Sequence, residues 1–120
     1  MTVRELYDKL GADYADACKR LMNEGMVVRF VQRFPTDPSM QLLRQAVADE
    51  DIETSFRAIH TLKSVSGILC LTQLYQAAWN LTEQLRPRQE QADKELLAVV
   101  EAEYEKTIAA INEFAAGLNK

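Results

Sequence analysis

Apolar residues recur at steps of three and four along most of this sequence, which is the periodicity of helices that bury one face. β-branched residues do not alternate with polar residues over any useful length, so strand signals are almost absent. The four glycines and three prolines fall mostly between the periodic segments. The pattern therefore predicts an all-α protein.

The first third of the chain predicts short helices. Residues 2–10 form a lead-in that Gly11 closes, and residues 12–23 form a second segment that Asn23 and Gly25 interrupt. Residues 26–34 form a third segment, which Pro35 stops. The stripe of the second segment consists of Tyr14, Cys18, Leu21 and Met22. We interpret the methionines with apolar neighbours as core residues, namely Met22, Met26 and Met40.

Four longer segments follow, and we expect them to form the walls of an antiparallel four-helix bundle. The first has Asp37 as its predicted N-cap, Pro38 at its first helical position, and the acids of residues 49–51 at its end. The others begin near residue 52, at Thr72 as a predicted N-cap, and near residue 92. We expect one domain over residues 1–120, in which residues 1–34 pack on or extend a core of residues 37–118.

The segment from residue 52 contains His60, the one histidine of the chain. At about 100° per residue, His60 points roughly 110° away from the centre of the apolar stripe. We therefore expect the imidazole at the edge of the buried face, partly supported by packing and partly open to solvent. The stripe consists of Ile52, Phe56, Ile59, Leu62, Ser66 and Leu69.

The neighbours of His60 along the helix suit a group that handles phosphate. Arg57 and Lys63 lie three residues before and after it, so either cation can stabilise a phosphoryl group there. Ser64 and Gly67 are small, and glycine costs a helix about 1 kcal/mol relative to alanine. We interpret Gly67 as clearance for a partner protein. Free imidazole is largely neutral near pH 7 and is then a good nucleophile.

The composition narrows the function classes. Hydrophobic residues make up 48% and charged residues 27%, as in ordinary globular proteins. The net charge of −4 gives no basic footprint, so we expect no nucleic-acid binding. No apolar run is long enough to cross a bilayer, and the N-terminal residues are too acidic for a signal peptide. We expect a cytoplasmic protein in which Cys18 and Cys70 are reduced core residues, although two cysteines could also pair.

The run from His60 to Leu69, with Lys63, Ser64 and Gly67, resembles the signature of the histidine-containing phosphotransfer (HPt) family of bacterial two-component phosphorelays. The resemblance extends over about residues 11–90. Upstream it includes Phe30, Phe34, Asp37, Leu42, Leu43 and Phe56, and downstream Leu71, Leu74, Ala78, Leu81 and Leu85. The family usually has glycine where this chain has Ser64, and commonly has glycine near the turn where it has Cys70.

The resemblance implies a phosphocarrier without kinase activity. His60 would accept a phosphoryl group from the aspartate of one receiver domain and pass it to another, with Lys63 as electrostatic support. The implied partners are receiver domains of response regulators or hybrid histidine kinases, which would supply Mg²⁺, so we expect no cofactor on this chain. We also expect a monomer. Folding the helix pair back near residue 71 places Thr82 opposite His60, and Thr82 or Trp79 could orient the imidazole or line the docking surface with Arg57, Ser64 and Gly67.

Two other function classes stay open at this point. A domain of the same fold could act as an adaptor that binds a receiver or kinase without being phosphorylated. A metal- or haem-binding bundle is a further alternative, but one histidine and two separated cysteines show no recognised ligand spacing. A serine nucleophile near Ser64 lacks the G-x-S-x-G elbow, and a nucleotide-binding loop is absent from the sequence.

Overall fold

The computed structural model describes residues 1–118 of the chain, and within them it contains α-helices, one short 3-10 helix and no strand. The predicted all-α fold class is therefore confirmed. In chain order the elements are α1 (Val3–Leu10), α2 (Tyr14–Arg20), α3 (Glu24–Arg33), the 3-10 helix η1 (Phe34–Thr36), α4 (Ser39–Ala48), α5 (Ile52–Ile68), α6 (Thr72–Leu85) and α7 (Lys94–Leu118).

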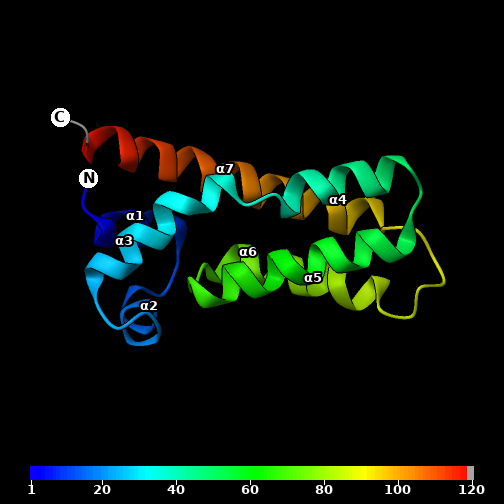
Figure 1. The fold of residues 1–120 in the computed structure, drawn as a ribbon, viewed down its shortest axis with the longest axis horizontal. Coiled ribbons are helices and arrows are strands. Elements are labelled where there is room, and N and C mark those ends of the chain that lie inside the picture. The colour runs from blue at the N-terminus through cyan, green and yellow to red at the C-terminus, as the bar shows by residue number, and fades with distance from the viewer. Residues whose placement is uncertain (119–120) are drawn as a thin grey trace.

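Helices α4 to α7 form an elongated antiparallel bundle (Figure 1). Helix α5 packs against both α4 and α6, and α6 packs against α7. Residues 49–51 and 69–71 are the only links between α4 and α5 and between α5 and α6, and such short connections require antiparallel neighbours. The molecule measures 46 × 26 × 19 Å along its principal axes. The site helix α5 is thus held between two neighbours and keeps one face outside.

The short helices α1, α2 and α3 gather at the end of the molecule where the chain begins and α7 ends (Figure 1). Helix α1 packs against α7. It begins with a capping box between Thr2 and Glu5 and ends at Gly11, whose φ of 62° is the left-handed conformation that glycine adopts without strain. The buried Tyr7 hydroxyl donates a hydrogen bond of 2.7 Å to the Leu69 carbonyl oxygen. This bond fixes α1 to the C-terminal end of α5.

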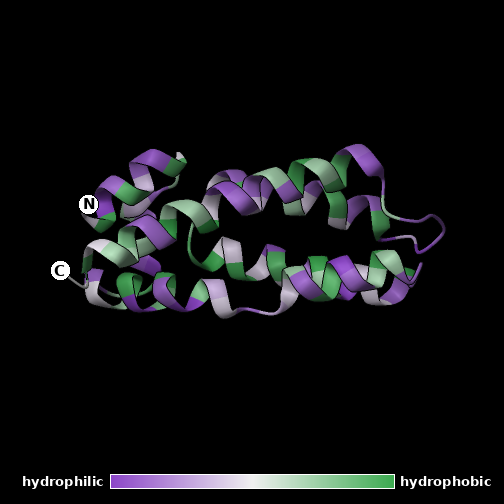
Figure 2. Cartoon of the chain, turned by 90° about the horizontal axis from the view of Figure 1, so that it is seen from above, coloured by the Kyte–Doolittle hydropathy of each residue, from purple (hydrophilic) through white to green (hydrophobic). Residues whose placement is uncertain are grey.

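The core follows the apolar stripes of the helices. Figure 2 shows hydrophobic and hydrophilic residues in turn along each helix, as expected when each buries one face. From α5, Phe56, Ile59 and Leu62 are buried, and α7 contributes Val100, Ile111 and Phe114. No helix of residues 1–118 combines the length and the apolarity that crossing a lipid bilayer requires.

Helix boundaries near the turns differ from the predicted ones. Met22 is 87% exposed with a φ of 81°, so its interpretation as a core residue was wrong. Helix α2 has already ended at Arg20, and the left-handed backbone at Met22 turns its side chain out of the stripe. Met40 is buried, as predicted, whereas Met26 is only half-buried and lies outside the buried core, so its interpretation as a core residue was wrong. The prediction of Asp37 as the N-cap of α4 and Pro38 as its first helical residue was wrong by one position, because Pro38 is the N-cap and α4 starts at Ser39, whose amide donates to the Asp37 carboxylate at 2.9 Å.

The turn between α5 and α6 is a Schellman motif. The Leu71 amide donates to the Ser66 carbonyl at 3.0 Å, and the Cys70 amide donates to the Gly67 carbonyl at 3.1 Å. Cys70 has a φ of 55°, in the left-handed region where glycine is favoured. The prediction that Thr72 is the N-cap of α6 was wrong, because Leu71 occupies that position and Thr72 is the first helical residue.

Candidate functional site

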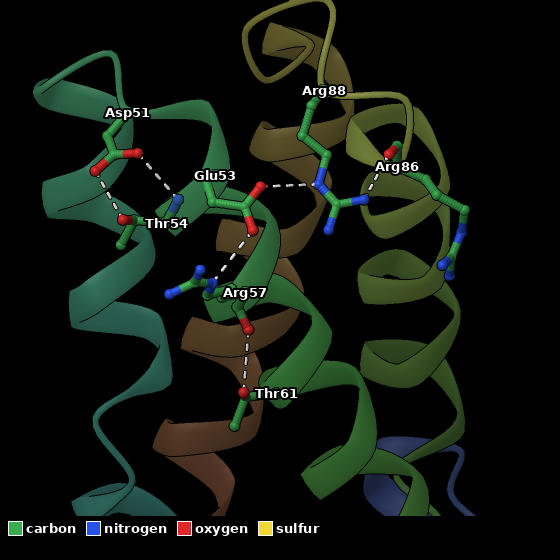
Figure 3. Close-up of polar contacts among 7 residues, drawn as sticks. All are labelled: Asp51, Glu53, Thr54, Arg57, Thr61, Arg86 and Arg88. Carbon is green, nitrogen blue, oxygen red and sulfur yellow. Dashed lines mark hydrogen bonds and ion pairs between the residues drawn. The ribbon is translucent and has the colours of Figure 1, made fainter.

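Helix α5 presents His60 from the middle of a well-anchored helix. The Asp51 carboxylate accepts from the Thr54 amide at 3.0 Å and from the Thr54 hydroxyl at 2.7 Å (Figure 3). These bonds lower the pKa of Asp51, so the cap stays charged at neutral pH. Because the N-cap fixes where the helix begins, it also fixes which side chains of α5 face outwards.

His60 lies on the exposed side of α5, directly after the buried pair Ala58 and Ile59. Its ring centroid is 5.8 Å from the centroid of the Phe56 ring, one turn earlier. Among residues 1–118 the imidazole nitrogens form no hydrogen bond, so they remain open to an incoming group. The predicted position of the imidazole, supported on one side and open on the other, is confirmed.

Two arginines from the loop after α6 surround the same Phe56 ring. The guanidinium carbon of Arg88 lies 3.6 Å from the ring centroid, and that of Arg86 lies 5.5 Å from it. Such stacking is favourable because the electron-rich face of the ring attracts a cation. Together these residues line a shallow hollow at the surface, whose lining consists of Phe56, Arg57, His60, Thr61, Arg86 and Arg88.

The hollow is rich in cations, which two carboxylates partly balance. Glu53 pairs with Arg57 at 3.2 Å and with Arg88 at 3.0 Å, and lies between them in Figure 3. Arg86 pairs with Glu83 at 2.7 Å. All of these side chains are at least about a third exposed, so each pair contributes little to stability. Their main effect is to hold three guanidinium groups beside the histidine.

Lys63 lies one turn beyond His60 and is half-buried. Its charge helps to lower the pKa of Glu83, after the larger effect of the hydrogen bond from Arg86. Lys63 therefore lies on the side of α5 that faces α6. Within the described chain its ammonium group forms no ion pair within 4 Å.

The two small residues after Lys63, Ser64 and Gly67, lie in different surroundings. Ser64 is exposed, and its hydroxyl donates to the His60 carbonyl oxygen at 3.1 Å. Gly67 lies against α6, where an added Cβ would come within 3.0 Å of the Tyr75 ring. The structure thus gives Gly67 a packing reason, because a residue without a side chain lets α6 lie close to α5. Its predicted part in partner access stays a prediction.

Thr82 and Trp79, the two residues of α6 that were predicted to orient the imidazole or line the docking surface, differ in their burial. Thr82 is fully buried, and its hydroxyl donates to the Ala78 carbonyl at 2.7 Å. Its assignment to the docking surface was therefore wrong, because Thr82 faces the core and its only donor is used within its own helix. Trp79 is 41% exposed and so remains available at the surface.

No cluster of three or more potential metal ligands occurs in residues 1–118. Cys18 and Cys70 are free thiols, with Cys70 buried and Cys18 half-buried. The Cys70 thiol contacts the Asp16 carboxylate at 3.4 Å, and burial, with the help of this carboxylate, raises the Cys70 pKa to about 11. A thiol with such a pKa is a poor nucleophile at neutral pH.

The comparison with protein families decides the identity of the fold. The model of the family described as Hpt domain matches residues 25–110, which is most of the chain. The chain belongs to the Hpt domain family. Hpt domains are phosphocarriers that take part in histidine phosphotransfer in two-component signalling. A search of curated proteins and a search of solved structures each found no match.

Sequence reasoning missed two residues that line the hollow around His60, Arg86 and Arg88. The signal that could have found them is the antiparallel return of α6 along α5, which brings the residues after Leu85 back to the start of α5. Two cations separated by Pro87 at that point lie beside the histidine that α5 carries.

Proposed function

We propose that this Hpt domain accepts a phosphoryl group on His60 from the aspartate of a receiver domain and passes it to another receiver. The observation that carries the proposal is the exposed imidazole, free of hydrogen bonds within residues 1–118, in a cation-lined hollow. An imidazole that must react with another protein has to be accessible, and the transferred group is anionic.

The proposed roles divide between His60 and Lys63. The lone pair of an imidazole nitrogen attacks the phosphorus of the aspartyl phosphate, a P–N bond forms, and the P–O bond breaks. The aspartate leaves as a carboxylate with the electron pair, and the reverse reaction loads the next receiver. Lys63 stabilises the charge on the phosphoryl oxygens without forming a bond. Mg²⁺ would come from the receiver, so this chain would need no cofactor of its own.

An apolar hollow on the same side of α5 supports docking of a receiver. It lies between α3, η1, the two residues that precede α4, and the C-terminal end of α5, and Ile68, 51% exposed, is one of its lining residues. His60, Ser64 and Ile68 are spaced by four residues and thus share one face of α5. A partner on this face would cover both the imidazole and apolar surface, as a specific interface does. The other apolar residues lining the hollow are Phe30, Phe34, Pro38, Val65 and Leu69.

The remaining docking residues in the proposal are Arg57, Ser64, Gly67 and Trp79. Arg57 has a 75% exposed side chain beside His60, and its charge complements the acidic pocket around a receiver aspartate. Exposed charges of this kind act mainly on the rate of association, which suits a carrier that must release each partner.

Transfer from a phosphorylated receiver tests the proposal. Mixed with a receiver domain labelled on its aspartate, the protein should gain a label that is stable in base and lost in acid. His60→Gln should keep the helical circular dichroism spectrum and lose the label. Equal labelling of His60→Gln and wild type would show that the site assignment is wrong. Binding of the receiver without any transfer, unchanged by His60→Gln, would favour the adaptor function instead.

A further inference from the structure

The arginine next to His60 with the most contacts is Arg88. It pairs with Glu53 at 3.0 Å, donates to the Arg86 carbonyl oxygen at 2.7 Å and stacks on the Phe56 ring at 3.6 Å. Its φ of 55° lies in the left-handed region, and its amide donates to the Leu85 carbonyl at 3.0 Å. The loop therefore adopts an unusual backbone conformation where this side chain reaches across to α5.

The Phe56 ring brings Arg88 and His60 to the same place. The imidazole and the guanidinium both lie against this ring, and both line the same hollow. Arg57, by contrast, makes a single ion pair at 3.2 Å from a side chain that is 75% exposed. Arg88 is thus a better-positioned cation than Arg57, with a planar group that can donate two parallel hydrogen bonds to a phosphate.

Glu53 occupies the guanidinium of Arg88 while His60 is unmodified. A carboxylate carries one negative charge, whereas a phosphoryl group on His60 carries up to two and offers three acceptor oxygens. The phosphoryl group can therefore compete with Glu53 for the same cation. Arg88 and His60 line the same hollow, so the exchange would require movement of the Arg88 side chain within that hollow.

We propose that Arg88 exchanges the Glu53 carboxylate for a phosphoryl oxygen when His60 is phosphorylated, and that this contact prolongs the lifetime of the phosphohistidine. The inference rests on the proposed function, and it adds a residue that holds the product. Arg88 forms and breaks no covalent bond. It is a positioning residue that acts on the charge of the transferred group.

Hydrolysis limits the lifetime of the phosphohistidine, so a cation that slows hydrolysis would lengthen this lifetime. Water attacks the phosphorus, the P–N bond breaks with its electron pair returning to the imidazole, and inorganic phosphate leaves. A guanidinium bound to the phosphoryl oxygens stabilises the resting phosphohistidine and covers part of the path by which water reaches the phosphorus. When no receiver is bound to supply groups that stabilise the transition state, the stabilised starting state therefore hydrolyses more slowly.

Hydrolysis of the isolated phosphoprotein tests this proposal without any receiver. The protein is phosphorylated with phosphoramidate, the donor is removed, and the phosphohistidine signal is followed by ³¹P NMR. Arg88→Ala should shorten the lifetime about two- to fivefold, the effect expected for an exposed ion pair. Arg88→Lys should restore part of the loss, and Glu53→Gln should lengthen the lifetime because it removes the competing carboxylate.

Arg29→Ala is the matched control, because Arg29 is exposed on α3, away from the hollow, and its loss changes the net charge equally. Equal lifetimes for Arg88→Ala and Arg29→Ala would overturn the inference, as would a Glu53→Gln lifetime equal to or shorter than that of wild type. If His60 of wild type is phosphorylated but Arg88→Ala does not change the lifetime of the phosphohistidine, only this inference fails. If neither phosphoramidate nor a receiver labels His60, the proposed function fails and the inference fails with it.

Discussion

The Tyr7 hydroxyl donates a hydrogen bond of 2.7 Å to the Leu69 carbonyl oxygen, and both residues are buried. Leu69 follows the last residue of α5, the helix that carries His60, whereas Tyr7 belongs to α1 near the start of the chain. The bond joins positions 62 residues apart in the sequence. It therefore couples the N-terminal helices to the end of the site helix.

Tyr7→Phe should lower the free energy of unfolding by about 1–2 kcal/mol, because it leaves the buried Leu69 carbonyl without this donor while keeping the ring. Urea denaturation at pH 7, followed by circular dichroism, measures the change. Tyr75→Phe is the control, since Tyr75 is half-buried and its hydroxyl makes no hydrogen bond within residues 1–118. Equal effects of the two variants would contradict the coupling of α1 to α5.

The same tyrosine predicts how stability depends on pH. Burial, with a smaller contribution from the Cys70 thiol, raises the pKa of Tyr7 above its usual value near 10. Above pH 10 the unfolded chain loses this proton while the folded protein keeps it, so stability should fall as the pH rises. The contribution is complete below pH 10. Urea denaturation of wild type and Tyr7→Phe between pH 8 and about 11 should show a shallower decline for the variant, and parallel declines would contradict the prediction.

The sequence predicted the long helices and the outward position of His60 correctly, because α5 offers seventeen residues over which an apolar stripe can be placed. A segment of only a few residues is too short to show such an apolar stripe. Thus Met22 was assigned to the core although the left-handed backbone at its position turns it outwards. Thr82 was assigned to the surface by folding back the helix pair, which gives the level of a residue along the bundle but not its rotation about the helix axis.

The arginine-lined hollow was beyond sequence reasoning for a different reason. The position of Arg88 depends on a left-handed residue in a loop and on stacking against Phe56, which lies 32 positions earlier in the chain. Neither feature leaves a periodic signal. Gly67 shows the converse case: its presence was noticed, but its contact with Tyr75 depends on the packing of α5 against α6.

The contact between Gly67 and Tyr75 predicts a coupling between the two residues. In wild type, Gly67→Ala gains helix propensity but pushes a Cβ to within 3.0 Å of the Tyr75 ring. In a Tyr75→Ala background the obstacle is gone, so the same substitution should stabilise the protein by about 1 kcal/mol. A double-mutant cycle in urea should therefore show that Gly67→Ala is less favourable in wild type. Identical effects in both backgrounds would leave Gly67 without this packing reason.

The burial of Thr82 predicts that its hydroxyl takes no direct part in transfer. Thr82→Val keeps the shape of the side chain and removes only the bond to the Ala78 carbonyl, which the backbone of α6 already engages. The initial rate of labelling from a phosphorylated receiver should stay within about twofold of wild type, since the substituted group lies in the core. Thr82→Ser, which keeps the hydroxyl, is the control. A large loss in Thr82→Val alone would show that this hydroxyl does orient the imidazole.

Lys63 should affect the rate of phosphotransfer without being essential for it. Its ammonium group makes no ion pair within the part of the chain that the structure describes, and a charge that only stabilises the phosphoryl oxygens lowers the barrier without forming the bond. Lys63→Ala should therefore slow labelling from a receiver about three- to tenfold, equivalent to roughly 1 kcal/mol, and Lys63→Arg should retain most of the rate. Lys19→Ala, on the exposed side of α2, removes the same charge far from His60 and should leave the rate unchanged. Stopped reactions sampled over time measure these rates. Complete loss in Lys63→Ala with the fold intact would mean that Lys63 does more than stabilise charge, and equal rates for Lys63→Ala and Lys19→Ala would mean that it does not act on the phosphoryl group at all.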